Sequence, residues 1–226
     1  MIDIWSAAAV MAGPRAGADE DWRAVYGFWF PPGLDADAKT HRRMLDWWFN
    51  GGSNAAMLPF APVLEAARAG RLDHWRATPL GRLSLILVLD QFPRGLSAGT
   101  PDAYASDLDA LLIAEEGLWN GHHAALAKPW EKMFYAMPLV HAEGPGHVER
   151  LKHVVALSET VAREAPEHLR PLYEFSVGQA RGHLDVVSRF GRFPHRNPVL
   201  GRASTPEEAA YVAKGDFVHK RRPPEG

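Results

Sequence analysis

Along most of the chain, apolar residues recur at intervals of three and four positions, which is the spacing of one face of an α-helix. Thr-Pro pairs, single glycines and a Gly-Gly step separate these segments, and such residues begin or end helices. No segment alternates apolar and polar residues between two-residue turns, as a β-hairpin would. The pattern therefore predicts an all-α protein, a compact array of eight or nine helices in antiparallel pairs.

Thr-Pro pairs mark three expected helix starts, at residues 78–79, 100–101 and 205–206. Threonine caps the free backbone N–H groups, and proline fits the first helical position because it has no N–H to satisfy. Glu208 adds a capping box to the third start. The segment at residues 80–92, LGRLSLILVLDQF, is apolar on nearly every side, which predicts a buried central helix.

The pattern divides the chain into three parts. Residues 1–18 form a variable N-terminal segment, which is apolar but lacks the basic residues that begin a signal peptide. Residues 19–217 form a single all-α domain, and residues 218–226 form a flexible tail. No window approaches the roughly 18 apolar residues of a membrane span, so we expect a cytoplasmic protein without membrane contact.

Composition narrows the chemistry that the chain can perform. The formal net charge of −2 over 226 residues gives no electrostatic reason to expect a nucleic-acid partner. The absence of cysteine excludes disulfides, thiolate metal sites and a cysteine nucleophile. The eleven histidines and eight tryptophans are high counts, and they supply groups for proton transfer and for an apolar binding wall.

Asp90 stands near the end of the central apolar helix, with Gln91 beside it and Arg94 one turn later. Pro93 is expected to break the helix at this point. A buried carboxylate is costly unless it is paired, and Arg94 is the nearest partner on the same face. Two interpretations stay open: a structural salt bridge that pins the helix end, or a functional carboxylate in a cleft.

The segment at residues 189–197, RFGRFPHRN, combines basic side chains with two phenylalanines and a proline. We expect the phenylalanines to anchor a loop from which Arg192, His195 and Arg196 point into a cleft. Arginine forks suit a carboxylate or a phosphate, and His195 can exchange a proton near neutral pH. The alternative is that these arginines cap carbonyl groups and pair with acidic residues of other segments.

The segment FYAMPLVHAEG places His141 two residues before Glu143, after a helix-interrupting proline. Together with His183 they would make two histidines and one carboxylate, the ligand set of a non-heme iron site, so a divalent transition metal is a candidate cofactor. The spacing matches no known zinc or iron motif. A chain with eleven histidines also produces such triples by chance.

These segments resemble a known family. LILVLDQFPRG, FYAMPLVHAEG and RFGRFPHRN...LGRASTPEE, in this order, are similar to the bacterial domain-of-unknown-function family 924, from about residue 22 onward. The resemblance implies a fold similar to tetratricopeptide-repeat proteins and implies little about activity. The family usually has Asn, Arg and Ser where this chain has Gly95, Ala98 and Ala142. The chain has thus lost polar groups near the expected cleft. Two interpretations stay open: its ligand is less charged or different from that of typical members, or the segment has simply drifted.

We expect a small-molecule-binding protein, and an enzyme, whose cleft takes an anionic or carboxylate-bearing substrate. Its sharper form is a metal-dependent oxygenase or hydrolase. The alternative is a peptide- or protein-binding helical-repeat scaffold, in which the charged cluster is structural. The apolar DWWF segment at residues 46–49 suggests a homo-oligomer. The expected site comprises the catalytic candidates Asp90, His141, Glu143 and His195, the substrate-binding candidates Gln91, Arg94, Arg192, Arg196 and Trp29, and the metal candidates His141, Glu143 and His183.

Overall fold

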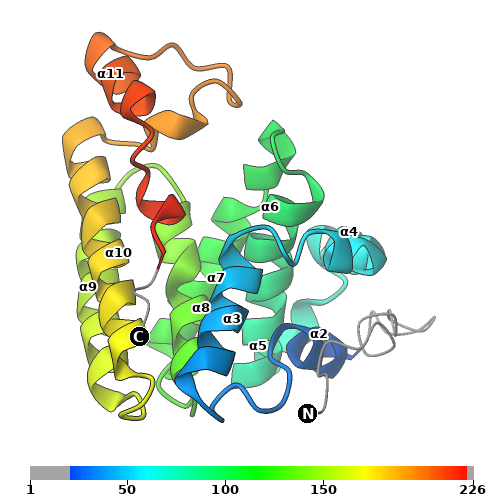
Figure 1. Cartoon of the computed structure of the whole chain (residues 1–226). Helices are drawn as coiled ribbons and strands as arrows, with labels where there is room; N and C mark the ends of the chain where they lie inside the picture. Colours follow the sequence, from blue (N-terminus) through cyan, green and yellow to red (C-terminus); the bar gives the residue numbers. More distant parts are fainter. Residues whose placement is uncertain (1–20, 223–226) are drawn as a thin grey trace.

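All regular structure that the computed structural model describes, over residues 21–222, is helical and contains no β-strand (Figure 1). The predicted all-α array is confirmed for this part of the chain. The predicted segment at residues 1–18 and residues 223–226 of the predicted tail lie outside the described residues.

The helices follow one another with short connections. The α-helices are α2 (Trp22–Trp29), α3 (Ala38–Phe49), α4 (Ala61–Arg68), α5 (Pro79–Ile86), α6 (Phe92–Leu96), α7 (Asp107–Trp119), α8 (Pro129–His141), α9 (His147–Glu164), α10 (Arg170–Phe190) and α11 (Pro206–Lys214). A π-helical turn, η4 (Leu87–Gln91), joins α5 to α6. The 3-10 helices are η2 (Ala55–Phe60), η3 (Asp73–Ala77), η5 (Pro101–Tyr104), η6 (Pro194–Arg196) and η7 (Val218–Lys220).

Helices that are neighbours in sequence also pack together. The long helices α9 and α10 form an antiparallel pair on one side of the molecule, α8 packs between α9 and α7, and α5 lies against α7 and α2 (Figure 1). Short connections between antiparallel neighbours account for this order. Tetratricopeptide likeness remains an expectation from the family resemblance. No helix within residues 21–222 has the length and apolar character needed to cross a membrane.

The central helix runs from α5 through η4 to the end of α6, and its core residues are almost completely buried. The expectation that Pro93 breaks the helix is wrong, since α6 continues to Leu96. Proline cannot donate the next helical hydrogen bond and its ring displaces the carbonyl one turn earlier. The turn ahead widens instead, and the Phe92 N–H donates to the Leu87 carbonyl five residues back. Such π-turns are frequent at functional sites.

Two of the three Thr-Pro starts are confirmed. The Thr78 hydroxyl accepts a hydrogen bond from the Gly81 N–H at 3.2 Å, and α5 begins at the proline. Thr205 and Glu208 form the predicted capping box of α11, with distances of 2.8 and 3.2 Å. The third start is wrong, because Thr100-Pro101 opens the short η5 and α7 begins only at Asp107.

Aromatic side chains of α2, α3, the central helix and α8 form one cluster in the core. The ring centroids of Trp29 lie 5.8 Å from Phe92 and 5.6 Å from Phe134, and Trp48 lies 4.9 Å from Phe134. Trp48 Nε1 also donates to the Trp29 carbonyl oxygen at 3.0 Å. This cluster fixes α2, α3 and α8 around a common space, and Trp29 and Trp48 form part of its lining.

The chain after α11 returns along α10 as a short extended segment that includes η7 (Figure 1). Val218 is buried against Gly182 of α10, where any larger residue would meet the valine methyl groups. Gln179 on α10 also donates to the Arg221 carbonyl oxygen at 3.3 Å. These contacts hold a part of the predicted tail against the domain, next to the cavity described below.

Candidate functional site

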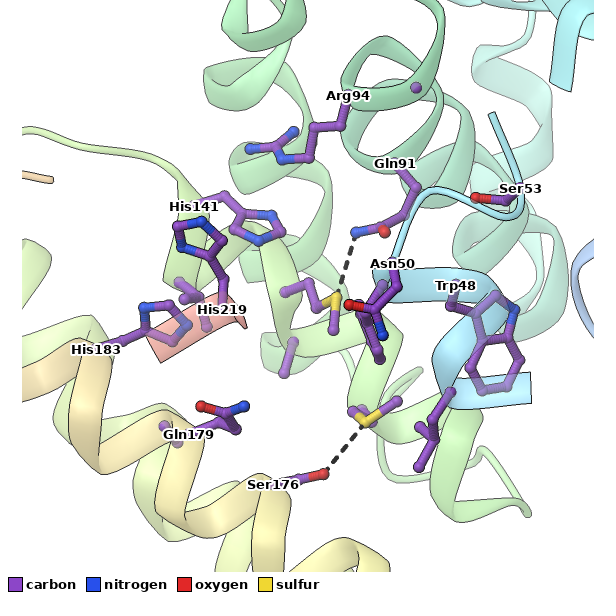
Figure 2. A pocket seen from close by; sticks show the side chains of 18 of the residues that line it. Trp48, Asn50, Ser53, Gln91, Arg94, His141, Ser176, Gln179, His183 and His219 are labelled. Atoms are coloured by element: carbon purple, nitrogen blue, oxygen red, sulfur yellow. Dashed lines mark hydrogen bonds between the residues drawn. The ribbon is translucent and has the colours of Figure 1, made fainter. Parts of the chain in front are cut away.

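A cavity of about 490 Å³ lies between α3, the central helix, α8, α9, α10 and η7. This volume falls within the range of about 300–1,000 Å³ that is typical of small-molecule sites. Figure 2 shows polar side chains from the end of α3 (Asn50), from α10 and from the central helix facing the same space. Its apolar end is lined by Leu45, Trp48, Phe49, Met133, Met137, Val154, Leu157 and Val161, and its polar end by Gln91, Arg94, His141, His183, His195, Arg196 and His219.

Asp90 and His141 form a directly bonded pair at the polar end. The π-turn aims the Asp90 carboxylate, which is completely buried, at the last residue of α8. His141 Nδ1 lies 2.8 and 2.9 Å from the two carboxylate oxygens, and Gln91 Nε2 donates to one of them at 2.6 Å. Burial by itself would raise the pKa of Asp90, but His141 and Arg94 outweigh it and hold that pKa at about 2.

His141 is therefore held as a neutral imidazole in one tautomer. Burial lowers its pKa, nearby Arg94 lowers it further, and Asp90 opposes both effects. An ionised carboxylate accepts only, so Nδ1 carries the proton and Nε2 is the basic nitrogen. No hydrogen bond to Nε2 is present among residues 21–222, and the residue lines the cavity (Figure 2).

Two arginines surround this pair, and aspartates neutralise both. Arg94 donates to Asp107 Oδ1 at 2.8 Å and to the Asp90 backbone carbonyl, and lies 3.5 Å from the Asp90 carboxylate. Arg196 donates to the His141 carbonyl oxygen at 2.9 Å and to Asp107 Oδ2 at 3.4 Å. We call Asp90, Arg94, Asp107 and Arg196 the ion-pair cluster. It ties η4, α6, α7 and η6 together without a net charge, and Arg196 also binds α8 through the His141 carbonyl.

Three further histidines gather beside the ion-pair cluster. The rings of His195 and His219 are 4.5 Å apart, and His183 and His195 each pack on Phe193 at 5.5 and 5.6 Å. Burial lowers the pKa of His183 and of His195 to about 3, and neighbouring histidines and Arg196 add to the effect. At neutral pH these rings are uncharged, and each offers one donor and one acceptor.

His219 completes this group from the C-terminal segment. Its ring is partly desolvated and lies near Lys220 and Arg196, which together lower its pKa, although the residue stays exposed at the rim. His141, His183 and His219 face one another in Figure 2. We call His183, His195 and His219 the histidine cluster. No nitrogen of these three rings has a hydrogen-bond partner within residues 21–222.

Glu143 and Arg192, both predicted site residues, do not line the cavity. Glu143 is half-buried, accepts from the Phe193 N–H at 2.7 Å and pairs with Arg202. Burial would raise its pKa, but those hydrogen bonds outweigh it and lower the pKa. Arg192 donates to both oxygens of Glu208 at 2.7 and 2.9 Å. Both residues fix the 189–197 loop in place, which is the role that the structural alternative expected for the arginines.

The proposed metal triple is not assembled. His141 and His183 face the same space, but the oxygens of Glu143 are engaged by Arg202 and by the backbone of the loop. Over residues 21–222, no group of three or more histidine, aspartate or glutamate side chains is arranged to hold a metal ion.

Some donors at the cavity are only partly satisfied. Besides the Asp90 carboxylate, Gln91 Nε2 reaches Met137 Sδ at 3.2 Å, and Ser176 Oγ, which also donates to the Leu172 carbonyl oxygen at 3.2 Å, lies 3.8 Å from Met133 Sδ. Both sulfur contacts are shown as dashed lines in Figure 2. Thioether sulfur is a weak acceptor. Arg196 Nε and Trp29 Nε1 are buried without a partner among the described residues. Unsatisfied donors in a cavity favour a ligand with acceptor oxygens.

The comparisons with known proteins agree with the resemblance noted in the sequence. The model of the family described as "Bacterial protein of unknown function (DUF924)" matches residues 25–216. The chain belongs to this family. It is also similar to a solved structure titled as a protein of unknown function from Agrobacterium tumefaciens, with 34% identity, a TM-score of 0.64, and coverage of 75% of this chain and 90% of the other. The search of curated proteins gave no match.

The three departures from the usual family pattern lie at or near the cavity. Gly95 and Ala98 line it, and Ala142 is buried in the core beside His141. A Cβ atom on Gly95 would come within 2.0 Å of the Met57 methyl group, so a larger side chain in this family position needs a different neighbour there. Gly95 and Ala98 themselves contribute no polar side chain to the cavity wall at the end of the central helix.

Sequence reasoning missed two residues of this family member's site. Asp107 was not singled out, although it bridges both arginines of the ion-pair cluster. His219 was assigned to the flexible tail. The apolar pair Phe217-Val218 ahead of it was the available signal, because a solvated tail has no need for such residues.

Proposed function

We propose that this protein is an enzyme that binds a small organic acid in the cavity and uses His141 as a general base, with Asp90 as its positioning residue. The bond between His141 Nδ1 and the buried Asp90 carboxylate, 2.8 Å long at the edge of a large cavity, carries the proposal. The same arrangement of carboxylate, imidazole and open Nε2 underlies general-base catalysis in other proteins.

In this scheme Nε2 of His141 removes a proton from a bound water or from an acidic group of the substrate. The proton stays on Nε2, and the resulting imidazolium is stabilised by the Asp90 carboxylate 2.8 Å away. Arg94, which Asp107 holds in place, favours the ionised state of Asp90 that this requires. The salt bridge and the positioning role are thus two consequences of the same contacts.

The other predicted activities have less support. The metal-dependent form lacks Glu143 near the two histidines, because Arg202 binds that carboxylate. A scaffold for peptides would be expected to bury few charges, whereas this chain buries Asp90, Glu131 and Arg196. The cavity with its oriented imidazole is the more specific feature.

The tautomer of His141 provides a test that needs no substrate. Long-range ¹H–¹⁵N NMR at pH 7 is expected to show a neutral ring with the proton on Nδ1, and Asp90→Asn is expected to redistribute the tautomers. His153→Gln, at an exposed position on α9, is the control for assignment and should leave that signal unchanged. A proton on Nε2 of His141, or a charged His141 ring at pH 7, would refute the proposal that His141 is the general base. Ligands found by thermal shift should then be turned over by the wild type and not by His141→Gln.

A further inference from the structure

The fixed charges around the cavity cancel one another. Among the described residues, each cation that lines it has a carboxylate partner: Asp90 and Asp107 for the two arginines of the ion-pair cluster, Glu164 for Lys132 at 2.8 Å and Asp216 for Arg221 at 3.1 Å. Asp46 adds an exposed carboxylate at the apolar end. A buried anion would therefore find no unpaired positive charge, and burying an uncompensated charge is costly.

The histidine cluster is the group that can supply a positive charge. Its three rings are neutral at pH 7, have no hydrogen-bond partners in the part of the chain that the structure describes, and meet at one end of the cavity. The charged and titratable groups around them are Arg196, Arg202, Lys220, His141 and His147, and each of them opposes a proton on the cluster. An anion among the rings reverses this balance, because it favours the protonated ring.

The remainder of the cavity favours a ligand with an apolar body. From the histidine cluster it runs along Ser176 and Gln179 of α10 toward Met133, Trp48 and Phe49, and these positions carry no charge (Figure 2). Methionine side chains adapt their shape to flexible apolar groups. Among the described residues, the histidine cluster at the polar end can supply a counter-charge to an acidic head group by taking up a proton.

We propose that the cavity binds an amphipathic monocarboxylic acid, whose carboxylate lies within the histidine cluster and takes up one proton there, while its apolar body fills the end formed by α3, α8 and α9. This inference rests on the proposed function and specifies its ligand. A monoanion matches one proton on the cluster, whereas a phosphate ester would bring a second charge that the neutral ion-pair cluster does not offset.

Calorimetry with defined probes tests the proposal. Octanoate, decanoate and 4-phenylbutanoate are compared with decanol, decyl phosphate and decanesulfonate, each in two buffers of different ionisation enthalpy. At least one carboxylate is expected to bind more tightly than about 1 mM and about tenfold more tightly than the alcohol and the phosphate. About one proton per ligand should be taken up near pH 6, and the affinity should fall by up to about tenfold per pH unit above it.

Two controls assign the proton to the protein. Decanesulfonate stays ionised at these pH values, so uptake with this probe belongs to the histidines. The double variant His183→Gln/His219→Gln should weaken decanoate binding at least about tenfold and remove most of the uptake, since about 1.4 kcal/mol corresponds to each factor of ten. If the double variant does not fold, His219→Gln alone, at an exposed rim position, provides the test. This single variant should weaken decanoate binding about threefold or more. His153→Gln is the matched control and should bind as the wild type does.

Several outcomes would overturn the proposal: no carboxylate binding, equal binding of decanol, preference for decyl phosphate, uptake seen only with carboxylates, or unchanged binding in the histidine variants. The proposed function fails differently, through the wrong tautomer of His141 or the absence of turnover. Binding with proton uptake but without turnover would support this inference and contradict the proposal that the protein is an enzyme.

Discussion

The contribution of Asp90 to stability can be predicted in some detail. Asp90→Asn keeps the shape of the side chain but removes its charge, within a completely buried site. The variant loses an ionic hydrogen bond from His141 and the attraction to Arg94, and one amide hydrogen then faces Gln91 or His141, which are themselves donors. Because Asp107 still pairs with Arg94, the arginine does not become an unpaired buried charge.

The magnitude follows from the pKa of the carboxyl group. A fall from 3.8 to about 2 is close to two units, and each unit is worth about 1.4 kcal/mol, which gives about 2–3 kcal/mol. Hydrogen bonds to charged groups are worth about 1.5–3 kcal/mol each, which agrees with this value. For a domain of this size, Tm should fall by about 4–12 °C.

The pH dependence has a definite sign. The folded-state pKa lies below the unfolded one, so the stabilisation is fully present above about pH 4 and is lost as the pH falls through about 2. The difference between wild type and Asp90→Asn should therefore shrink between about pH 4 and pH 2. Urea unfolding followed by tryptophan fluorescence measures it. Asp185→Asn, at an exposed position on α10, should change the free energy of unfolding by less than about 0.5 kcal/mol. A loss below about 1 kcal/mol, or one independent of pH, would refute the argument.

Three further predictions concern the helix packing, the loop and the C-terminal segment. A Cβ atom at Gly117 would lie 1.6 Å from the Tyr135 hydroxyl oxygen, so Gly117→Ala should lower the free energy of unfolding by about 1–3 kcal/mol. Gly178 has open space around it, so Gly178→Ala should raise the free energy of unfolding by about 0.5–1 kcal/mol. Thermal unfolding of the two variants tests both values. Glu143→Gln should cost about 1–2 kcal/mol in urea unfolding while the NMR signal of the His141 imidazole stays unchanged, and a shifted tautomer would contradict the purely structural role. Val218→Asp should detach the segment after α11 from α10, seen as faster tryptic cleavage there and weaker decanoate binding, with the domain's own melting temperature nearly kept; unchanged cleavage would count against this packing.

The fold was largely predictable because its signals are local. Helical periodicity and two Thr-Pro caps placed helices correctly, and the all-apolar segment became the buried central helix. The errors are also local in origin. Pro93 widened a turn instead of ending the helix, since the apolar residues on both sides gain more from staying packed than the lost hydrogen bond costs. Thr100-Pro101 begins the short 3-10 helix η5, and the predicted α-helix starts only at Asp107.

The site was less predictable, because charge partners are chosen across the fold. Glu143 and His141 are two residues apart, yet one meets Arg202 and the other meets Asp90. Spacing within a segment says which side chains share a face, and says nothing about which distant side chain lies opposite. Arg192 illustrates this point: its partner Glu208 was recognised as a capping residue, and the same carboxylate also binds the arginine.

The arrangement of charges changes what the basic residues do. Arginine was expected to hold the ligand's anionic group, but Arg94 and Arg196 are both committed to aspartates, and in the proposed function they help to orient the base. An arginine keeps its charge at all accessible pH values, so a neutralised pair cannot adapt to a ligand. Histidine can adapt to a ligand, because its protonation state changes with the charges around it. In the proposed ligand binding, the ion-pair cluster would therefore provide rigidity and the histidine cluster the adjustable charge. Ligand binding should then depend on pH in a way that the stability of the ion pairs near neutral pH does not.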